Sequence, residues 1–343
     1  MISRRTVLAT SAAGATVWAA GPAAAAAERP DLGPSAATDG STNAFNIISD
    51  IQGDLGDFVV ALRDIAATNP RSTGLAIAGD ITPRGYDFEY AQVASTFAAN
   101  PHAAETAWAI GNHEFYVPKW AAPDKLSQST WPNGTTEDSL FKSFYNFAGR
   151  NKVYNEQSFG GIPVLMIGTE KYMRYHDTTL WDQVWMSDEQ FAWLEDRLWY
   201  WRRRQSPVMV ISHHPLPDTV TSTRNRLFMN DYLQADRLLQ VLGRHPDVFF
   251  FTGHTHRPLE RGDWYIRRVV PGTANLDGFH TINTGAIETG WLDNPDGVGE
   301  VVPGGFNQGL QIEAGPRWVT VKARDFMRQE WIKQIRIPLS GTR

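Results

Sequence analysis

Cysteine is absent from this chain of 343 residues. Disulfide bonds are therefore excluded, and a metal site has to use imidazole, carboxylate or amide ligands in place of thiolates. A chain of this length buries enough apolar surface to fold without covalent cross-links, even in an oxidising compartment. The absence of cysteine thus restricts the chemistry of a site but not the size of the fold.

An excess of positive charge is also missing. There are 32 Lys and Arg residues against 37 Asp and Glu residues, which gives a net charge of -5. Sequence-independent nucleic-acid binding depends on basic side chains that neutralise phosphates, and no basic stripe is visible. The three arginines at 202–204 close a predicted helix, whose C-terminal end favours cations. We expect no general nucleic-acid binding.

No segment of the sequence reads as a transmembrane span. The N-terminus places Arg4 and Arg5 before a mildly apolar stretch, and a run of small residues ends at a plausible cleavage site before Glu28. This pattern predicts a twin-arginine signal peptide over residues 1–27 and a flexible lead-in over 28–43. Cleavage leaves 30 basic and 37 acidic residues, a net charge of -7. We expect the twin-arginine export machinery of a bacterium to deliver the protein to the cell envelope or the extracellular space.

Polar residues follow short apolar runs at five places in the chain. Runs of this kind, rich in Ile or Val, are typical of buried parallel strands, and open α/β sheets place ligand sites at the carboxyl ends of such strands. We therefore expect these polar side chains to form one cluster. The runs are 46–49 before Asp50 and Gln52, 75–78 before Asp80, 108–110 before Asn112 and His113, 208–212 before His213 and His214, and 248–251 before His254 and His256.

In their order along the chain, these motifs resemble those of the calcineurin-like metallophosphoesterase superfamily. The resemblance covers roughly residues 45 to 290 and rests on Asp50-x-Gln52, Gly79-Asp80, Gly111-Asn112-His113-Glu114, His213-His214-Pro215 and Gly253-His254-x-His256. It implies a four-layered α/β/β/α sandwich of two mixed sheets flanked by helices, within a single domain over residues 44–343. It also implies a dinuclear metal centre that hydrolyses phosphate esters.

The resemblance assigns a role to each polar residue of the cluster. Two divalent ions, with Mn, Fe or Zn expected, would activate a hydroxide for in-line attack on phosphorus. His113 would contact the phosphate and assist the leaving group, or else only hold its loop. Asn112, Arg84 and His214 are the expected substrate contacts, although Arg84 could simply be solvated and His214 could instead support the ligands. Asp50, Gln52, Asp80 and His256 would hold one metal, and Asn112, His213 and His254 the other, with Asp80 bridging.

Two positions depart from the family pattern. Gln52 stands where most members have histidine, and an amide oxygen is a weaker ligand than imidazole. We therefore expect a first metal site that is looser or that prefers oxygen-tolerant ions such as Mn²⁺ or Mg²⁺. Pro83 stands where Ser/Thr protein phosphatases have an aspartate paired with the catalytic histidine. The same residue occupies the place of the tyrosine ligand of purple acid phosphatases. Both subgroups are therefore disfavoured.

Outside the motifs the chain alternates predicted helices and strands. Helices are expected at 58–67, 88–98 and 187–204, the last opened by a capping box at Ser187. In that last helix an apolar face led by Phe191 is expected to join the core. Strands are expected at 281–283, 310–313, 318–322 and 331–337, all antiparallel and completing the second sheet.

Two aromatic-rich insertions, at about 115–159 and 171–186, should lie near the metal-bearing strand ends. They could stack a base, cover a lipid or grip a sugar, or they could only pack on each other as a cap. We expect a phosphodiesterase, rather than a phosphomonoesterase, acting on a small-molecule or lipid phosphate ester. The alternative is a degenerate member that binds a phosphorylated envelope or nucleotide ligand without turnover. The alcohol part of the substrate and the oligomeric state do not follow from the sequence.

Overall fold

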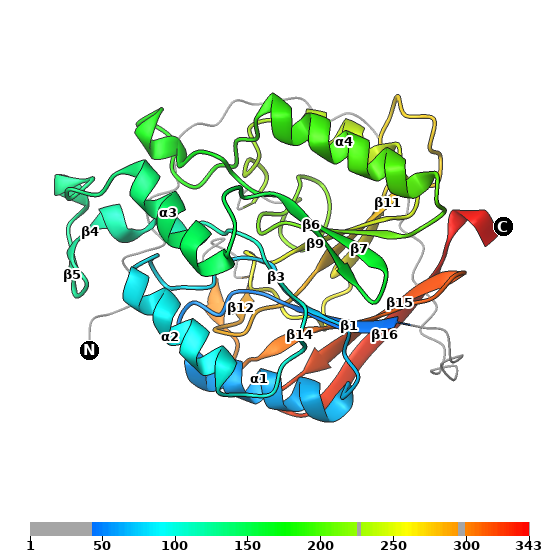
Figure 1. Ribbon diagram of the computed structural model, residues 1–343, viewed down its shortest axis with the longest axis horizontal. Helices are drawn as coiled ribbons and strands as arrows, with labels where there is room; N and C mark the ends of the chain where they lie inside the picture. Colours follow the sequence, from blue (N-terminus) through cyan, green and yellow to red (C-terminus); the bar gives the residue numbers. More distant parts are fainter. Residues whose placement is uncertain (1–42, 225–227, 294–298, 343) are drawn as a thin grey trace.

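Two six-stranded mixed sheets pack face to face, with helices on both outer faces (Figure 1). The computed structural model describes residues 43–224, 228–293 and 299–342. The predicted signal peptide, and the lead-in up to residue 42, lie outside the described residues. Within those residues, no helix combines the length and apolarity needed to span a bilayer.

The first sheet has the strand order β16-β15-β14-β1-β2-β3. Strands β1, β2 and β3 run parallel, and β14 pairs antiparallel with β1, for example through Phe45 opposite Ile312. The carboxyl ends of the three parallel strands therefore reach one edge of the sheet. The strands are β1 (Asn43–Ile48), β2 (Leu75–Ile77), β3 (Thr106–Trp108), β14 (Gln308–Ala314), β15 (Trp318–Asp325) and β16 (Glu330–Pro338).

The second sheet has the order β10-β11-β9-β8-β7-β6. Its four central strands are parallel, and β10 and β6 are antiparallel edges. This sheet contributes the ends of β8 and β9 to the site described below. Its strands are β6 (Asn155–Phe159), β7 (Ile162–Met166), β8 (Val208–Ile211), β9 (Val248–Thr252), β10 (Tyr265–Arg268) and β11 (Phe279–Asn283).

Three apolar layers separate four layers of secondary structure. In β9, Phe249 and Phe251 enter the core between the sheets, whereas Val248 and Phe250 face the helices of the second sheet. This alternation is the period of two that a strand buried on both faces requires. Helices α1 (Leu55–Thr68), α2 (Asp87–Ala98) and α3 (Glu137–Ala148) share the core outside the first sheet, and α4 (Asp188–Arg202) and α5 (Ala235–Gly243) the core outside the second. The predicted four-layered sandwich is confirmed.

The C-terminal strands correct one expectation. We expected all four to be antiparallel and to complete one sheet, but β11 is parallel to β9 in the second sheet. Strands β14, β15 and β16 form an antiparallel extension of the first sheet beyond β1. The chain crosses between sheets after β11, and periodicity within a strand carries no information about which sheet it joins.

The three predicted helices are present with small shifts at their ends. Ser187 caps α4, because its side chain accepts a hydrogen bond from Gln190 N at 3.1 Å. The reciprocal half of the capping box is absent from this helix, because the Gln190 amide instead bonds both backbone groups of Gly168. Phe191 is buried as expected.

The two insertions contain short elements and contact each other. Phe115 stacks on Tyr172 with ring centroids 5.3 Å apart, and Trp131 meets Tyr175 at 4.5 Å. Part of their aromatic content therefore packs as a cap on the first sheet's outer core. The last residues of the first insertion form β6. The short elements are η2 (His113–Phe115), η3 (Val117–Lys119), β4 (Trp120–Ala122), β5 (Lys125–Leu126), η4 (Gln128–Thr130) and η5 (Met173–Tyr175), with β12 (Trp291–Leu292), β13 (Glu300–Val301) and η6 (Ser340–Thr342) elsewhere.

Candidate metal centre

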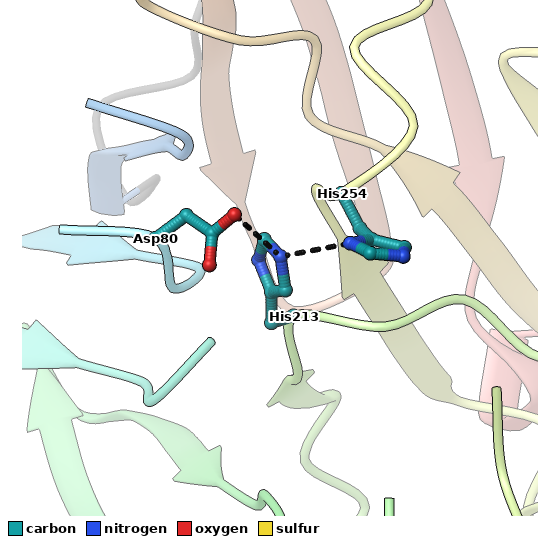
Figure 2. A group of neighbouring side chains, drawn as sticks. All are labelled: Asp80, His213 and His254. Carbon is teal, nitrogen blue, oxygen red and sulfur yellow. Dashed lines mark hydrogen bonds and ion pairs between the residues drawn. The ribbon is translucent and has the colours of Figure 1, made fainter. Parts of the chain in front are cut away.

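Loops that follow β1, β2, β3, β8 and β9 converge at one edge of the sandwich. Both sheets contribute, and the polar residues that follow each strand are brought together as expected. Figure 2 shows Asp80, His213 and His254 from three of these loops, with the His213 ring between the other two. The first sheet supplies Asp50, Gln52, Asp80, Asn112 and His113, and the second supplies His213, His214, His254 and His256.

One group of ligand atoms surrounds His213 Nε2. This nitrogen lies 3.2 Å from Asp80 Oδ2, 2.9 Å from Asn112 Oδ1 and 3.2 Å from His254 Nδ1. Three electron-pair donors thus face a single ring nitrogen, which has at most one proton to offer. Such a set fits a cation better than it fits a hydrogen-bond network.

A second group shares Asp80 with the first. His256 Nε2 lies 3.1 Å from Asp50 Oδ1, and the Gln52 amide lies 3.0 Å from both His256 Nε2 and Asp80 Oδ2. Ligand atoms of Asp50, Asp80 and His256 are close enough to hold one ion, as are those of Asp80, His213 and His254. Asp80 is the one residue in both groups.

Backbone carbonyls orient two of the three rings, and a carboxylate lies near the third. His213 Nδ1 donates to Ala78 O at 2.8 Å and His256 Nδ1 donates to Thr289 O at 2.6 Å, which leaves each Nε2 facing the cluster. His254 is turned the other way. Its Nδ1 faces the cluster and its Nε2 lies 3.7 Å from Asp231 Oδ2, an oxygen that is buried without a hydrogen bond. Partners of this kind commonly fix the ring of a metal-ligating histidine.

The charges of the cluster follow from its geometry. Burial acts to raise the pKa of Asp80, but the charges of His213 and His113 outweigh it and hold the pKa well below its usual range. Burial acts to lower the pKa of His213, but Asp80 raises it to about 10. Burial lowers the pKa of His254 well below its usual value, and the charges of His214 and His213 add to this. Asp80 is thus an anion and His254 a neutral ring, both suited to bind a divalent cation.

Left-handed backbone conformations are concentrated in these loops. Non-glycine residues rarely adopt a positive φ, and such conformations persist only where the surrounding structure enforces them. Here they turn each chain sharply after its strand, so that side chains two residues apart both reach the cluster. The ligand candidates with positive φ are Asp50 at 55°, Gln52 at 43°, Asp80 at 52°, His254 at 67° and His256 at 51°.

His113 stands at the rim of the cluster with its side chain 24% exposed. Its Nδ1 donates to Pro83 O at 2.9 Å, which leaves Nε2 3.8 Å from Asp80 Oδ2. Pro83, whose side chain offers no carboxylate, therefore supplies a backbone carbonyl as the partner of this imidazole. The His113 ring is held by this hydrogen bond and is also partly exposed. A role in holding the loop and a role in contacting phosphate are therefore compatible.

Two other predicted substrate contacts, Arg84 and His214, lie outside both ligand groups. Arg84 Nε donates to Glu89 Oε1 at 2.7 Å, and the guanidinium lies over the Trp120 ring. These contacts hold the loop after β2, and a phosphate role for Arg84 stays a prediction. His214 is buried with its ring 4.5 Å from that of His254, and its Nε2 has no hydrogen bond. It supports the ligand ring, and its contact with substrate also stays a prediction.

Glu114 is a structural residue to which sequence reasoning assigned no role. Its buried carboxylate accepts hydrogen bonds from the backbone N–H groups of Asp80, Ile81, Thr82 and Gly111 at 2.7 to 3.1 Å, and from the Thr82 hydroxyl. It thereby joins the loops after β2 and β3. Burial and the charge of Asp80 raise the pKa of Glu114 to about 7, whereas the backbone donors favour its anion. The position of Glu114 directly after Asn112 and His113 in the Gly-Asn-His-Glu motif was the feature of the sequence that could have indicated this role.

Glu114→Gln is expected to lower the free energy of unfolding of the metal-free protein by about 2–4 kcal/mol, because a glutamine offers one acceptor oxygen and turns an NH₂ toward buried donors. Urea denaturation in the presence of a chelator measures this. Glu189→Gln is the matched control, since Glu189 is 71% exposed and pairs only with Lys152 among described charges. It should change stability by less than about 0.5 kcal/mol. Equal losses in the two variants would contradict the role of Glu114.

The sandwich and the two overlapping ligand groups define a metal-dependent hydrolase. A family described as calcineurin-like phosphoesterase matches residues 44–258, and the chain belongs to this family. It is a metallophosphoesterase, a hydrolase of phosphoric ester bonds. Residues 259–342 match a second family, described as a domain of unknown function. No curated protein matches the sequence.

Solved structures share the fold at low sequence identity. A dimetal phosphatase from Danio rerio is 16% identical, with a TM-score of 0.56 over 88% of this chain and 100% of that one. A purple acid phosphatase from yellow lupin (Lupinus luteus) seeds is 14% identical, with a TM-score of 0.59 over 88% of this chain. The chain spans 54% of the lupin protein. These similarities concern the fold alone.

Proposed function

We propose that the protein hydrolyses phosphate esters at a dinuclear metal centre and prefers phosphodiesters to phosphomonoesters. The observation that supports this most is that Asp80 belongs to both ligand groups. A carboxylate shared by two cations offsets part of their repulsion. Asp50, Gln52, Asp80 and His256 would hold one ion, and Asp80, Asn112, His213 and His254 the other.

When bound, two divalent cations would lower the pKa of a water molecule and neutralise charge on the phosphate. The nitrogen and oxygen ligands suit Mn, Fe or Zn. His113 Nε2 faces the same space, so it can donate a hydrogen bond to a phosphate oxygen. In its protonated form it can transfer the proton to the leaving-group oxygen as the P–O bond breaks. Positioned acids of this kind contribute about 10²- to 10⁴-fold to the rate.

Two observations support diesters over monoesters. The partner of His113 is the Pro83 carbonyl, where protein phosphatases place an aspartate. Tyr116, from the first aromatic insertion, also lies beside His113 with ring centroids 4.4 Å apart, which suits a substrate with an organic group on each side of the phosphate. The structure thus supports a preference that the sequence suggested.

Hydrolysis of bis-p-nitrophenyl phosphate and of p-nitrophenyl phosphate tests the proposal. The full chain without its predicted signal peptide is assayed with Mn²⁺, Fe²⁺ and Zn²⁺, before and after treatment with a chelator. We expect faster hydrolysis of the diester, loss of activity on chelation, and recovery when metal is returned. Absence of hydrolysis by protein that carries two metal ions would overturn the proposal.

Gln52 favours a second candidate, a protein that binds a phosphorylated ligand without turnover. The Gln52 amide nitrogen donates to Asp80 Oδ2 at 3.0 Å, and the amide must turn to offer its oxygen to a metal. Since an amide oxygen is a weak ligand, the site shared with His256 would be the first to empty. Metal analysis separates the two functions, because two equivalents per chain favour the enzyme and one or none favours the binder.

Asp231→Ala is expected to weaken metal binding by about 10- to 100-fold, because Asp231 faces the outer nitrogen of His254 and similar partners have effects of this size. Titration calorimetry with Mn²⁺ measures the affinity. Asp218→Ala is the control, since Asp218 is 54% exposed and pairs with Arg268. Unchanged affinity in the Asp231 variant would show that His254 needs no such partner.

The cellular location is a separate proposal that rests on the sequence alone. Arg4 and Arg5, the apolar stretch and the small-residue run support export by the twin-arginine route. Replacement of both arginines by lysine should leave the protein in the cytoplasm of its host, and cell fractionation would detect this. Export of the lysine variant at the normal level would contradict the proposal.

A further inference from the structure

Tyr116 links the candidate metal centre to both insertions. Its hydroxyl accepts a hydrogen bond from Asn112 Nδ2 at 2.7 Å and donates one to Asp182 Oδ2 at 2.8 Å. Asn112 therefore keeps its amide oxygen toward His213, and Asp182, from the second insertion, stands one side chain away from a ligand candidate. A side chain that packs on Tyr116 therefore lies close to the ligand cluster, where the scissile phosphate of a substrate would bind.

Lys119 is that side chain. Its Nζ lies 3.1 Å from the centre of the Tyr116 ring and 4.9 Å from that of Trp181, and the side chain is only 12% exposed. Among the described residues, the nearest carboxylate oxygen is Asp182 Oδ1, 3.8 Å away. An ammonium group that serves only to pair with a carboxylate would approach it to about 2.7–2.9 Å. That Asp182 oxygen is buried without a hydrogen bond, so the Lys119–Asp182 ion pair is not in direct hydrogen-bonded contact.

The surroundings make this ammonium group costly to keep without a ligand. Burial lowers the pKa of Lys119 to about 8, although Asp182 and Asp80 act to raise it. An ammonium group has three N–H donors, and among the described residues Nζ makes ring contacts and the ion pair with Asp182 but no hydrogen bond to a protein acceptor. Its donors are therefore available to an anion that enters beside the metal centre.

A second cation lies on the same aromatic wall. The guanidinium of Arg174 lies 4.3 Å from the centre of the Trp181 ring, so Trp181 contacts both Arg174 and Lys119. The Arg174 Nε atom is buried without a hydrogen bond. The protein as a whole is acidic, with a net charge of -5. The two partly buried cations on Trp181 therefore form a local concentration of positive charge within the insertions.

We propose that Lys119 binds an anionic group, a phosphate or a carboxylate, that the substrate carries in addition to its scissile phosphate. Lys119 would then determine specificity, because a simple diester offers it nothing to bind. This inference rests on the proposed function, since it takes the ligand cluster as the place where the scissile phosphate sits.

Binding of matched ligands to the Mn²⁺-loaded protein tests the inference. Glycerol 3-phosphate and 3-phosphoglycerate differ mainly by a carboxylate, and AMP and ADP differ by a second phosphate. Calorimetry should show tighter binding of at least one anionic partner by wild-type protein. Lys119→Met should raise the Kd of that ligand by about 10-fold or more, and the Kd of the counterpart that lacks the extra anionic group by less than about threefold. Lys119→Arg should retain most of the preference.

Lys171→Met is the matched control, because Lys171 also stacks on a tryptophan of the second insertion, 3.8 Å from the ring centre of Trp185. This substitution should leave the ratio of the two Kd values unchanged for each ligand pair. If Lys119→Met does not fold, Lys119→Gln removes the charge with a smaller change in polarity. Equal changes for both members of each pair, or no preference in wild-type protein, would overturn the inference. Wild-type protein that lacks both metal and hydrolysis would instead count against the proposed function.

Discussion

Hydrolysis of bis-p-nitrophenyl phosphate is expected to fall by about 10⁴-fold or more when Asp80 is replaced by alanine. Asp80 alone belongs to both ligand groups, and its Oδ1 also accepts the backbone N–H of His113 at 2.9 Å. The substitution therefore removes a ligand from each metal site and a tether of the His113 loop. A loss of this size corresponds to about 5.5 kcal/mol of transition-state stabilisation. Measured kcat/KM at saturating Mn²⁺ checks the expectation.

Asp196→Ala is the control for this experiment. Asp196 lies on α4 with its side chain 71% exposed, and its nearest cation is Arg197 at 3.7 Å. It should leave kcat/KM within about twofold of wild type, because such exposed pairs contribute little. Metal analysis of the Asp80 variant should show fewer than two equivalents per chain. Equal activity of wild-type protein and the Asp80 variant would rule out the dinuclear mechanism.

Gly253→Ala is expected to reduce kcat/KM by at least about 100-fold while the protein remains folded. A Cβ atom at this position would lie 2.5 Å from Asp50 Oδ2 and 2.6 Å from Ser49 Oγ, which is closer than atoms can pack. The loop that carries His254 and His256 must therefore move away from Asp50. Displacement of about 1 Å in a catalytic site can cost a factor of about 100. Steady-state kinetics and Mn²⁺ calorimetry measure the effect.

Gly262 offers a matched position in the same segment of the chain. A Cβ atom there meets nothing within 4 Å, so Gly262→Ala should leave both the rate and the metal affinity unchanged. Circular dichroism would establish that the Gly253 variant keeps its fold. A Gly253 variant as active as the Gly262 variant would show that the His254 loop tolerates displacement.

Sequence reasoning located the ligand cluster because its signal is local. A buried strand has to end in residues that leave the apolar core, and parallel strands end at the same edge of a sheet. The short runs before Asp50, Asp80 and His213 therefore predicted their own convergence, and the structure places them together. The resemblance added the significance of the motif order and the assignment of each ligand to one of two metals.

Contacts made by loops could not be predicted in the same way. Asp231 lies beside His254 and Asp182 accepts a hydrogen bond from Tyr116, both in segments without periodicity, and their positions depend on how these loops pack. For Arg84 the sequence suggested a phosphate contact, which stays a prediction, but gave no sign that Glu89, five residues later, accepts a hydrogen bond from its side chain. The assignment of β14 to the first sheet depends equally on long-range packing, which the pattern of one strand does not encode.

The left-handed turns beneath the ligand side chains set stability and activity against each other. A residue with a Cβ atom loses about 1–2 kcal/mol in this conformation, whereas glycine loses almost nothing. The added freedom of glycine in the unfolded chain costs about 0.4–1 kcal/mol, which is the smaller term. In a gene copy released from selection for catalysis, glycine at His254 would thus ease the backbone conformation, whereas Asp50 also accepts the His254 backbone N–H and so contributes to stability itself. The turns beneath the metal centre therefore place a conformational cost on the very residues that would hold the metals.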